Sequence, residues 1–437
     1  MCDTFIATPK YTKNKTFIFG KNSDREPNEA QSILHIPRKI NQEKSLECTY
    51  ISIPQVKETN AIIISKPFWM WGAEMGINEH GLVIGNEAIF SKISANKKSK
   101  VLTGMDLIRL ALERTKNADD AIVLISTLIA KYGQGGNGGY KNNLYYFNSF
   151  IIADKKSAWV METIDNYWVA KKIKNYYSIS NRLTINNDYD LSSPKIEELV
   201  RQNNFIKKNQ EFSFKNAFSD RFLTHFSKSK QRLNATCNLA APIGEFTINS
   251  AIKILTSHYE HNFKPYKNYA GGSVCMHANG ILNPTQTTGS MIVELSKNKL
   301  PKILLTGTSN PCLSLYKPFV FGGNTILENN TVEPVHYFDK TLWWTAEKFH
   351  REVTKNYMEN TKIFKNDLKQ TQKQILDNYG NIFDDKLKTD DYSKSTIKLH
   401  LSKISEWSEA IKNKGNKRGN SIFYDFFWKK QNKVVRL

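Results

Sequence analysis

Strand-like and helix-like blocks alternate along this 437-residue chain, and their order limits the folds it can adopt. β-rich runs fill the first quarter, and helical periodicity begins at TGMDLIRLALERTKN. A second mixed region runs from about residue 190 to 325, and charged helical sequence follows residue 340. Sheets covered by helices suit this order better than regular βαβ winding, so we predict an α+β protein.

Several segments give specific expectations. CDTFIATP and KTFIFGKNSD flank a polar link and predict a hairpin, and NSFIIADKKSAWVMET predicts another. NADDAIVLISTLIAKYG predicts a helix that ends at Gly133, and VCMHAN and TGSMIVEL are strand candidates. We therefore divide the chain into a body over 1–340 and a helical C-terminal region over 341–437 that packs on it.

The formal net charge is +21, from 62 Lys and Arg against 41 Asp and Glu. These residues are spread along the chain, as in SANKKSK, AKKIKNYY and SKSKQR, and form no single basic arm. No nucleic-acid-binding motif accompanies them, so we predict a solvated basic surface and no specific nucleic-acid partner. Nucleic-acid binding through net charge is the alternative.

The five cysteines lie far apart, without a CxxC pair or a Cys/His ligand spacing, so we expect neither a metal nor another cofactor. We interpret His258 and His277 as core or hydrogen-bonded residues. A sparse, odd cysteine set and an N-terminus without an apolar signal region favour a cytoplasmic protein. AIVLISTLIA is too short to span a bilayer, so no transmembrane segment is expected. A homo-oligomer is left open.

The chain begins MCDTF, which places a cysteine directly after the first methionine. If Met1 is removed, Cys2 carries both a thiol and a free α-amine. The pKa of a free α-amine is ordinarily about 7.7–8.0, so near neutral pH it can act as a general base without a histidine. The thiol is then a candidate nucleophile. An ordinary cysteine is the alternative, and MC alone does not exclude it.

The segment GKNSDREPNE ends the first predicted hairpin, which could bring Lys21 and Asp24 beside Cys2. A cation near a thiolate lowers its pKa, and a carboxylate can hold a protonated amine. The alternative is an ordinary polar turn, since these residue types are common in turns.

With these residues in view, MCDTFIA…FGKNSDREPNEAQ resembles the start of the secernin and cysteine-type dipeptidase family, within the N-terminal nucleophile hydrolases. The resemblance continues in order through WMWGAEMGINEHGLVIGNEAIF, ISNRLTI, SDRFLTHF, VCMHAN and TGTSNPCLSLYKPFVF. It implies a four-layer αββα sandwich and a cysteine nucleophile at the mature N-terminus.

The resemblance also assigns roles to single residues. Cys2 matches the nucleophile, and Asp24 matches the aspartate that contacts its amine. Lys21 stands where related acylases have an arginine, which keeps the charge but loses a bidentate fork. Asn181 matches an oxyanion-hole amide, with Asn86 as candidate second donor, and Arg221 resembles the arginine that closes the polar network. Without the resemblance, the two asparagines would be read as buried strand-end amides and Arg221 as a surface residue.

The implied function is a cysteine-type amide hydrolase, a dipeptidase that cleaves small peptides or similar amides. Two alternatives stay open. One is a non-catalytic, secernin-like regulatory protein associated with exocytosis on the same scaffold, and the other is an acylase of a non-peptide amide. Glu74 and Glu79 could meet a substrate amine, but the sequence assigns neither.

Overall fold

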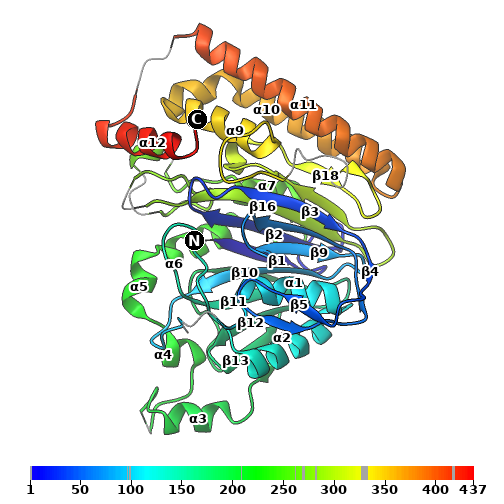
Figure 1. Cartoon of the computed structure of the whole chain (residues 1–437), viewed down its shortest axis with the longest axis vertical. Helices are drawn as coiled ribbons and strands as arrows, with labels where there is room; N and C mark the ends of the chain where they lie inside the picture. The colour runs from blue at the N-terminus through cyan, green and yellow to red at the C-terminus, as the bar shows by residue number, and fades with distance from the viewer. Residues whose placement is uncertain are drawn as a thin grey trace.

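Two large antiparallel sheets form the centre of the protein (Figure 1). The computed structural model describes residues 2–437 except 96, 98–99, 208, 261, 268–270, 281–282, 326–332 and 416–418, and the side chain of Arg221 is also outside it. The six-stranded sheet has the order β14 (Tyr176–Ser180), β1 (Asp3–Ala7), β2 (Phe17–Arg25), β16 (Gln286–Leu295), β17 (Lys302–Leu305) and β18 (Lys317–Phe319).

The second sheet has eight strands. Its order is β15 (Leu191–Ser192), β13 (Tyr167–Lys172), β12 (Ala158–Ile164), β11 (Phe147–Ala153), β10 (Val83–Ile89), β9 (Met75–Asn78), β8 (Ile62–Pro67) and β3 (Gln31–Ile36). Two short ribbons pair β4 (Lys39–Ile40) with β7 (Glu58–Thr59) and β5 (Ser45–Glu47) with β6 (Ser52–Pro54).

The helices fall into three groups along the chain. The first comprises α1 (Gly104–Arg114) and α2 (Ala118–Tyr132). The second comprises α3 (Ile196–Gln202), α4 (Phe214–Phe218), α5 (Arg221–Phe226), α6 (Ser229–Asn238) and α7 (Ile248–Leu255), followed by the 3₁₀ turns η1 (Pro265–Lys267) and η2 (Pro311–Leu313). The third comprises α9 (Leu342–Thr354), α10 (Tyr357–Ile382), α11 (Lys386–Asn413) and α12 (Ile422–Val434).

Alternating side chains explain how the sheets are covered on both faces. On β1, Phe5 packs in a cluster with α7, while its neighbour Ile6 packs in the core between the two sheets. Successive strand residues point to opposite faces, so Phe5 and Ile6 contribute to different apolar clusters. On the outer face of the eight-stranded sheet, Leu107 of α1 and Ile122 of α2 belong to one apolar cluster with Ile64 of β8.

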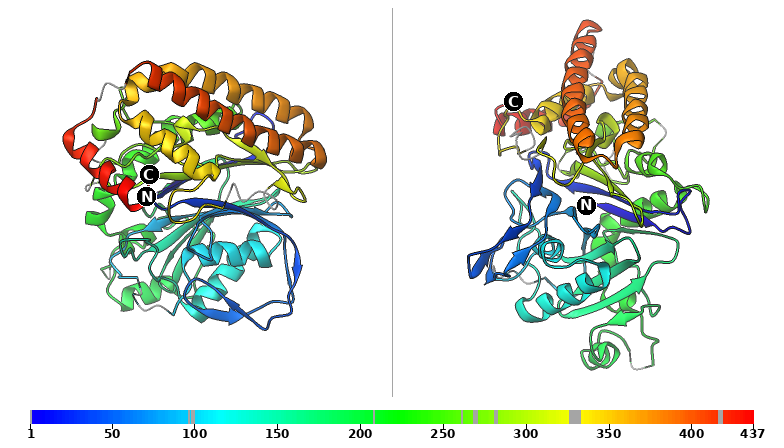
Figure 2. Two further views of the ribbon diagram at one scale, coloured as in Figure 1. Left: turned by 45° about the horizontal axis from the view of Figure 1, so that its top comes forward. Right: turned by 90° about the vertical axis from the view of Figure 1, so that its right-hand side faces the viewer.

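Helices therefore pack on the outer face of each sheet, and the four-layer αββα sandwich stays a prediction. Figure 2 shows α9 to α11 stacked beyond the six-stranded sheet, on the side away from α1 and α2. An apolar cluster that contains Phe349, Phe364 and Trp407 joins these three helices. The predicted α+β class with antiparallel sheets is confirmed. The N-terminal nucleophile assignment and the division at residue 340 stay predictions.

Most of the predicted elements form. The first hairpin is β1 and β2, the second is β11 and β12, and α2 ends at Gly133 with φ of 69°. The strand predicted at VCMHAN is wrong, because residues 274–279 have no regular secondary structure. TGSMIVEL falls within β16, as predicted. Among the described helices, none is both long and apolar enough to cross a bilayer.

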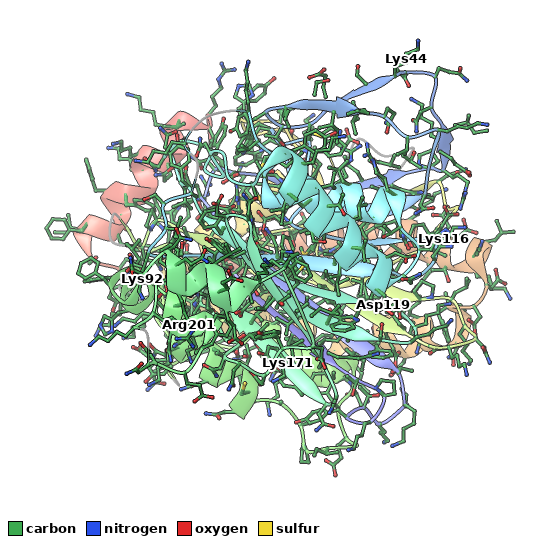
Figure 3. The ribbon with its side chains drawn as sticks, turned by 90° about the horizontal axis from the view of Figure 1, so that it is seen from below. Lys44, Lys92, Lys116, Asp119, Lys171 and Arg201 are labelled. Carbon is green, nitrogen blue, oxygen red and sulfur yellow. The ribbon has the colours of Figure 1, made fainter. Side chains whose placement is uncertain are left out.

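The basic residues are distributed, as the sequence predicts. Lys44, Lys92 and Lys116 are exposed and lie far apart around the molecule (Figure 3). SKSKQR departs from this pattern. Arg232, the last residue of that run, has no exposed surface. The prediction that this arginine is a solvated surface residue is therefore wrong, and its contacts are described below.

Candidate active site

Strand β14 brings residues far apart in the sequence to the N-terminus. Strands β11 to β13 lie in the eight-stranded sheet, whereas β14 pairs with β1 in the other sheet. In this register Asp3 lies opposite Ser180 on β14 and opposite Asn22 on β2. The residue that precedes β1, Cys2, therefore lies beside Asn181 on one side and β2 on the other.

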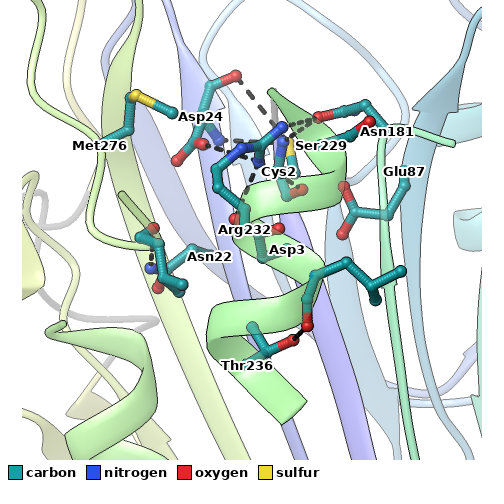
Figure 4. Close-up of polar contacts among 12 residues, drawn as sticks. Cys2, Asp3, Asn22, Asp24, Glu87, Asn181, Ser229, Arg232, Thr236 and Met276 are labelled. Carbon is teal, nitrogen blue, oxygen red and sulfur yellow. Dashed lines mark hydrogen bonds and ion pairs between the residues drawn. The ribbon is translucent and has the colours of Figure 1, made fainter. Parts of the chain in front are cut away.

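Cys2 is buried and contacts both neighbouring segments (Figure 4). Its backbone nitrogen donates to Asn181 Oδ1 at 2.9 Å. Its sulfur accepts a hydrogen bond from the Asp24 backbone N–H at 3.2 Å. Burial raises the pKa of the Cys2 thiol to about 12, although Lys21 lowers it. The thiol is therefore protonated at neutral pH and needs a base before it can attack as a nucleophile.

Lys21 supplies a fully buried cation next to this thiol. Its Nζ donates to the carbonyl oxygen of Asn86 and lies 3.4 Å from Glu87 Oε1 and 3.9 Å from Glu74 Oε2. Burial lowers the pKa of Lys21, but the Cys2 sulfur and the two carboxylates outweigh it, and the pKa is raised above its ordinary value. The ammonium group is thus a lasting positive charge in the site.

Arg232 on α6 links the two sides of the N-terminus (Figure 4). One guanidinium nitrogen donates to the Cys2 carbonyl at 3.0 Å and to Asp3 Oδ2 at 2.8 Å. The other donates to Asn181 Oδ1 at 2.7 Å. The first nitrogen also lies 4.0 Å from Asp24 Oδ2. A planar fork of this kind fixes several acceptors at once, which an ammonium group cannot do.

Asp24 contributes its carboxylate as well as its backbone N–H. Its Oδ1 accepts a hydrogen bond from Thr287 Oγ1 at 2.6 Å, which ties β2 to β16. Burial raises the pKa of Asp24 to about 7, although Arg232 lowers it. This carboxyl group therefore changes protonation near neutral pH, 4.0 Å from the arginine that binds the Cys2 carbonyl.

The structure brings four of the six predicted site residues together: Cys2, Lys21, Asp24 and Asn181. Asn181 holds the Cys2 nitrogen through Oδ1, while its Nδ2 donates to the Ala88 carbonyl at 3.0 Å. Its side chain therefore holds the backbone N–H of Cys2, and its role as an oxyanion donor stays a prediction.

The other two predicted site residues, Asn86 and Arg221, are not among the side chains that the described structure brings to Cys2. The Asn86 side chain donates to Asn148 Oδ1 at 2.9 Å, so Asn86 meets the site through its backbone carbonyl, which binds Lys21. The backbone of Arg221 opens α5, but its side chain lies outside the described part of the chain. Sequence reasoning did not single out Arg232, the arginine that the described structure does bring to Cys2.

The signal for Arg232 is weak in the sequence. The buried residues of α6 are Ser229, Arg232 and Thr236, which are polar and recur at helical spacing. A polar stripe of this kind is typical of a solvated helix face. It can be recognised as a buried face only when the helix is known to pack on β14 and β1.

Three further acidic and basic side chains complete the site. Glu74 Oε2 lies 3.9 Å from the Cys2 sulfur, and Glu74 Oε1 accepts from Arg25 at 3.1 Å. Arg25 also donates to Glu29 and to the Gly138 carbonyl, within the glycine-rich loop that follows α2. Buried charges are stable only when they are paired. The charged residues at the end of β2 therefore lie in a site where buried side chains of opposite charge pair with them.

We expect Glu87→Gln to flatten the fall of stability with rising pH. Burial raises the pKa of Glu87 to about 8, although Lys21 lowers it, against about 4.3 in an unfolded chain. Between these values the folded state holds a proton that the unfolded state has lost, so stability falls as pH rises from about 4 to about 8. In urea unfolding experiments, the free energy of unfolding should fall more between pH 5 and pH 8.5 for wild type than for Glu87→Gln. An equal fall in the two proteins would contradict this expectation.

Solved structures that this chain resembles include a C2A mutant of a conjugated bile acid hydrolase from Clostridium perfringens. The identity is 12%, the TM-score is 0.43, and the match covers 78% of this chain and 98% of that one. A penicillin V acylase from Agrobacterium tumefaciens matches with 12% identity, a TM-score of 0.40 and coverages of 72% and 86%. At these scores the likenesses are too distant to establish the fold or activity of this chain.

The family comparison is more decisive. The model of peptidase family C69 matches residues 45–373, which is most of the chain and includes Asn86, Asn181 and Arg232. Cys2, Lys21 and Asp24 precede the matched range. The match confirms the family predicted from the ordered motifs, and the chain belongs to peptidase family C69.

Proposed function

We propose that this protein is a cysteine-type dipeptidase whose nucleophile is Cys2, freed at the N-terminus by removal of Met1. Membership of a peptidase family supports a hydrolase that acts on amide bonds. The observation that carries the assignment to Cys2 is its set of buried contacts, in which Asn181 holds the nitrogen and the Asp24 N–H binds the sulfur. The proposal includes the αββα fold of the N-terminal nucleophile hydrolases over 1–340.

The first step is a proton transfer within Cys2. Because the thiol is protonated at neutral pH, it must lose its proton as the sulfur attacks the substrate carbonyl. The free α-amine of Cys2 takes up that proton, since the pKa of such an amine is ordinarily about 7.7–8.0. Asp24 and Asn181 hold the resulting ammonium group, and Lys21 stabilises negative charge on the sulfur.

The remaining steps follow from acyl transfer to a thiol. The attack forms a C–S bond and an oxyanion, for which Asn181 and Asn86 remain the candidate side-chain donors. The ammonium group of Cys2 then returns the proton to the leaving nitrogen as the C–N bond breaks. Water attacks the thioester, with the amine again as base, and releases the free thiol and the carboxylic acid product.

Glu74 supports a preference for peptides with a free N-terminus. Its Oε2 atom lies 3.9 Å from the nucleophilic sulfur. The scissile carbonyl of a dipeptide is separated from its amino group by a single carbon. A carboxylate this close to the sulfur is therefore within reach of the substrate ammonium group.

We expect Glu74→Gln to raise KM for free dipeptides by roughly 10- to 100-fold, since a hydrogen bond to a charged group contributes about 1.5–3 kcal/mol. N-acetylated dipeptides, which lack the charge, should change little. The matched control is Glu79→Gln, because Glu79 pairs with Arg38 at 3.0 Å and with the Ala61 N–H, away from Cys2. An equal loss on both substrate classes would contradict recognition of the amine.

A substrate panel tests the proposed function itself. The untagged protein should hydrolyse free dipeptides faster than N-acylated amides of the same size. Turnover of acylated amides alone would favour the acylase alternative. No turnover of either class would favour the non-catalytic regulatory protein.

A further inference from the structure

A second cluster of reactive side chains lies behind the candidate active site. It consists of His258, Cys275, His277 and Cys312. One nitrogen or sulfur atom from each residue lies within 4.8 Å of the corresponding atoms of the other three. Such a set of two thiols and two imidazoles matches the soft, tetrahedral ligand set that zinc prefers.

The distances suit a metal ion at the centre of the cluster. His277 Nε2 lies 3.2 Å from Cys312 Sγ and 3.7 Å from Cys275 Sγ. With bonds of about 2.3 Å to sulfur and about 2.0–2.1 Å to nitrogen, a tetrahedral zinc site separates its ligand atoms by roughly 3.3–3.8 Å. Both measured distances lie at or near this range, so a small contraction of the remaining pairs would complete the site.

Packing already orients the donors. The His258 ring stacks on Phe263 with centroids 3.8 Å apart and 6° between the planes. The His258 Nε2 atom is buried and makes no hydrogen bond of ordinary geometry among the described residues. Tyr357 packs edge-on against both histidine rings and its hydroxyl lies 3.6 Å from Cys312 Sγ. A zinc ion at the centre of the cluster would satisfy this buried nitrogen.

The backbone around the cluster is also fixed. The Cys275 N–H donates to the Ser257 carbonyl at 2.9 Å, which joins the segment after α7 to the segment before β16. Cys312 lies in η2, and the neighbouring Asn310 N–H donates to the Thr287 carbonyl at 2.8 Å. Three segments that are separate in the sequence therefore meet at four donor atoms.

We propose that His258, Cys275, His277 and Cys312 bind one zinc ion with a structural role. Four protein donors fill a tetrahedral shell and leave no open position for a substrate. An adjacent cavity of about 300 Å³, lined in part by His258, Cys312 and Tyr357, gives an entry path from solvent. The spacing of these residues, spread from 258 to 312 without a paired motif, explains why the sequence predicted no metal site.

The site has a consequence for the active site. Thr287 donates to the Asp24 carboxylate at 2.6 Å and accepts from the Met276 N–H at 2.9 Å. Met276 lies between the two ligands Cys275 and His277. Zinc at this point would therefore hold in place the segment that positions Asp24. Removal of the zinc would make the placement of Asp24 in the candidate active site less rigid.

Metal analysis of the untagged, reduced protein tests the proposal. We expect inductively coupled plasma mass spectrometry to find about one zinc ion per chain. Cobalt(II) in its place should give the visible bands of a tetrahedral site and near-ultraviolet thiolate-to-cobalt absorption. This spectrum reports the ligand set in the wild type, so the test stands even if a variant does not fold.

Single variants then identify the ligands. Cys275→Ser and Cys312→Ser should lower the bound zinc at least about tenfold, because each removes a thiolate ligand. The matched controls Cys48→Ser and Cys237→Ser should keep it, since both cysteines lie outside the cluster. Absence of zinc after incubation with the metal, unchanged binding in both ligand variants, or a Cys275–Cys312 disulfide in the isolated protein would each overturn the proposal.

Discussion

Cys2→Ala is expected to lower kcat/KM for dipeptide hydrolysis at least about 10³-fold, because it removes the atom that forms the acyl bond. Cys2→Ser should retain a small residual rate, since a hydroxyl is a weaker nucleophile that can still hand its proton to the α-amine. Initial rates on the best dipeptide of the panel provide the measurement. Both substitutions conserve the size of a buried side chain closely, so little loss of stability is expected.

The matched control is Cys237→Ala, at an exposed cysteine on α6. It should retain wild-type kcat/KM. Activity that survives in Cys2→Ala would exclude Cys2 as the nucleophile, whatever the other site variants show.

Arg232→Met is expected to lower the free energy of unfolding by about 3–5 kcal/mol, because it leaves the Asp3 carboxylate buried without its partner. Both side chains of this pair have no exposed surface. Burial raises the pKa of Asp3, although Arg232 lowers it, so loss of the arginine favours the protonated carboxyl group. The defect should therefore be smaller at pH 5 than at pH 8 in urea unfolding experiments.

Two comparisons isolate the buried pair. Arg38→Met removes ion pairs with Glu58 and Glu79 in which Arg38 is 41% exposed and its partners are 51% and 27% exposed, and should cost less than about 1 kcal/mol. Combining Arg232→Met with Asp3→Asn should recover part of the lost stability, because no buried charge is then unpaired. A cost for Arg232→Met no greater than that for Arg38→Met would show that the network does not hold the N-terminus.

The local part of the site could be predicted from sequence. Cys2, Lys21 and Asp24 lie on one hairpin, so a short link and two β-rich runs are enough to bring them together. The role of Lys21 also depends on Gly85 of the facing sheet. A Cβ at Gly85 would lie 2.7 Å from the Lys21 Cδ and 2.8 Å from the Phe19 Cζ, so any larger residue there would force these side chains to shift.

The non-local part depends on how the sheets pair. Asn181 reaches Cys2 because β14 leaves the order of β11 to β13 and joins the other sheet, which strand patterns alone do not specify. Arg232 and the four residues of the proposed zinc site need helix packing and an irregular segment in addition. Arg232 stands in a polar run typical of a solvated helix, and the four residues of the proposed zinc site lack the paired spacing of a metal motif. Of these residues, the resemblance assigned a role to Asn181 alone.

Intact-mass spectrometry of the untagged protein, alone and after reaction with an activated dipeptide ester, tests the central claim most directly. The account predicts a chain that lacks Met1, and a transient acyl adduct that maps to Cys2. A chain that retains Met1 and still turns over substrate would contradict it, as would an adduct on any other residue.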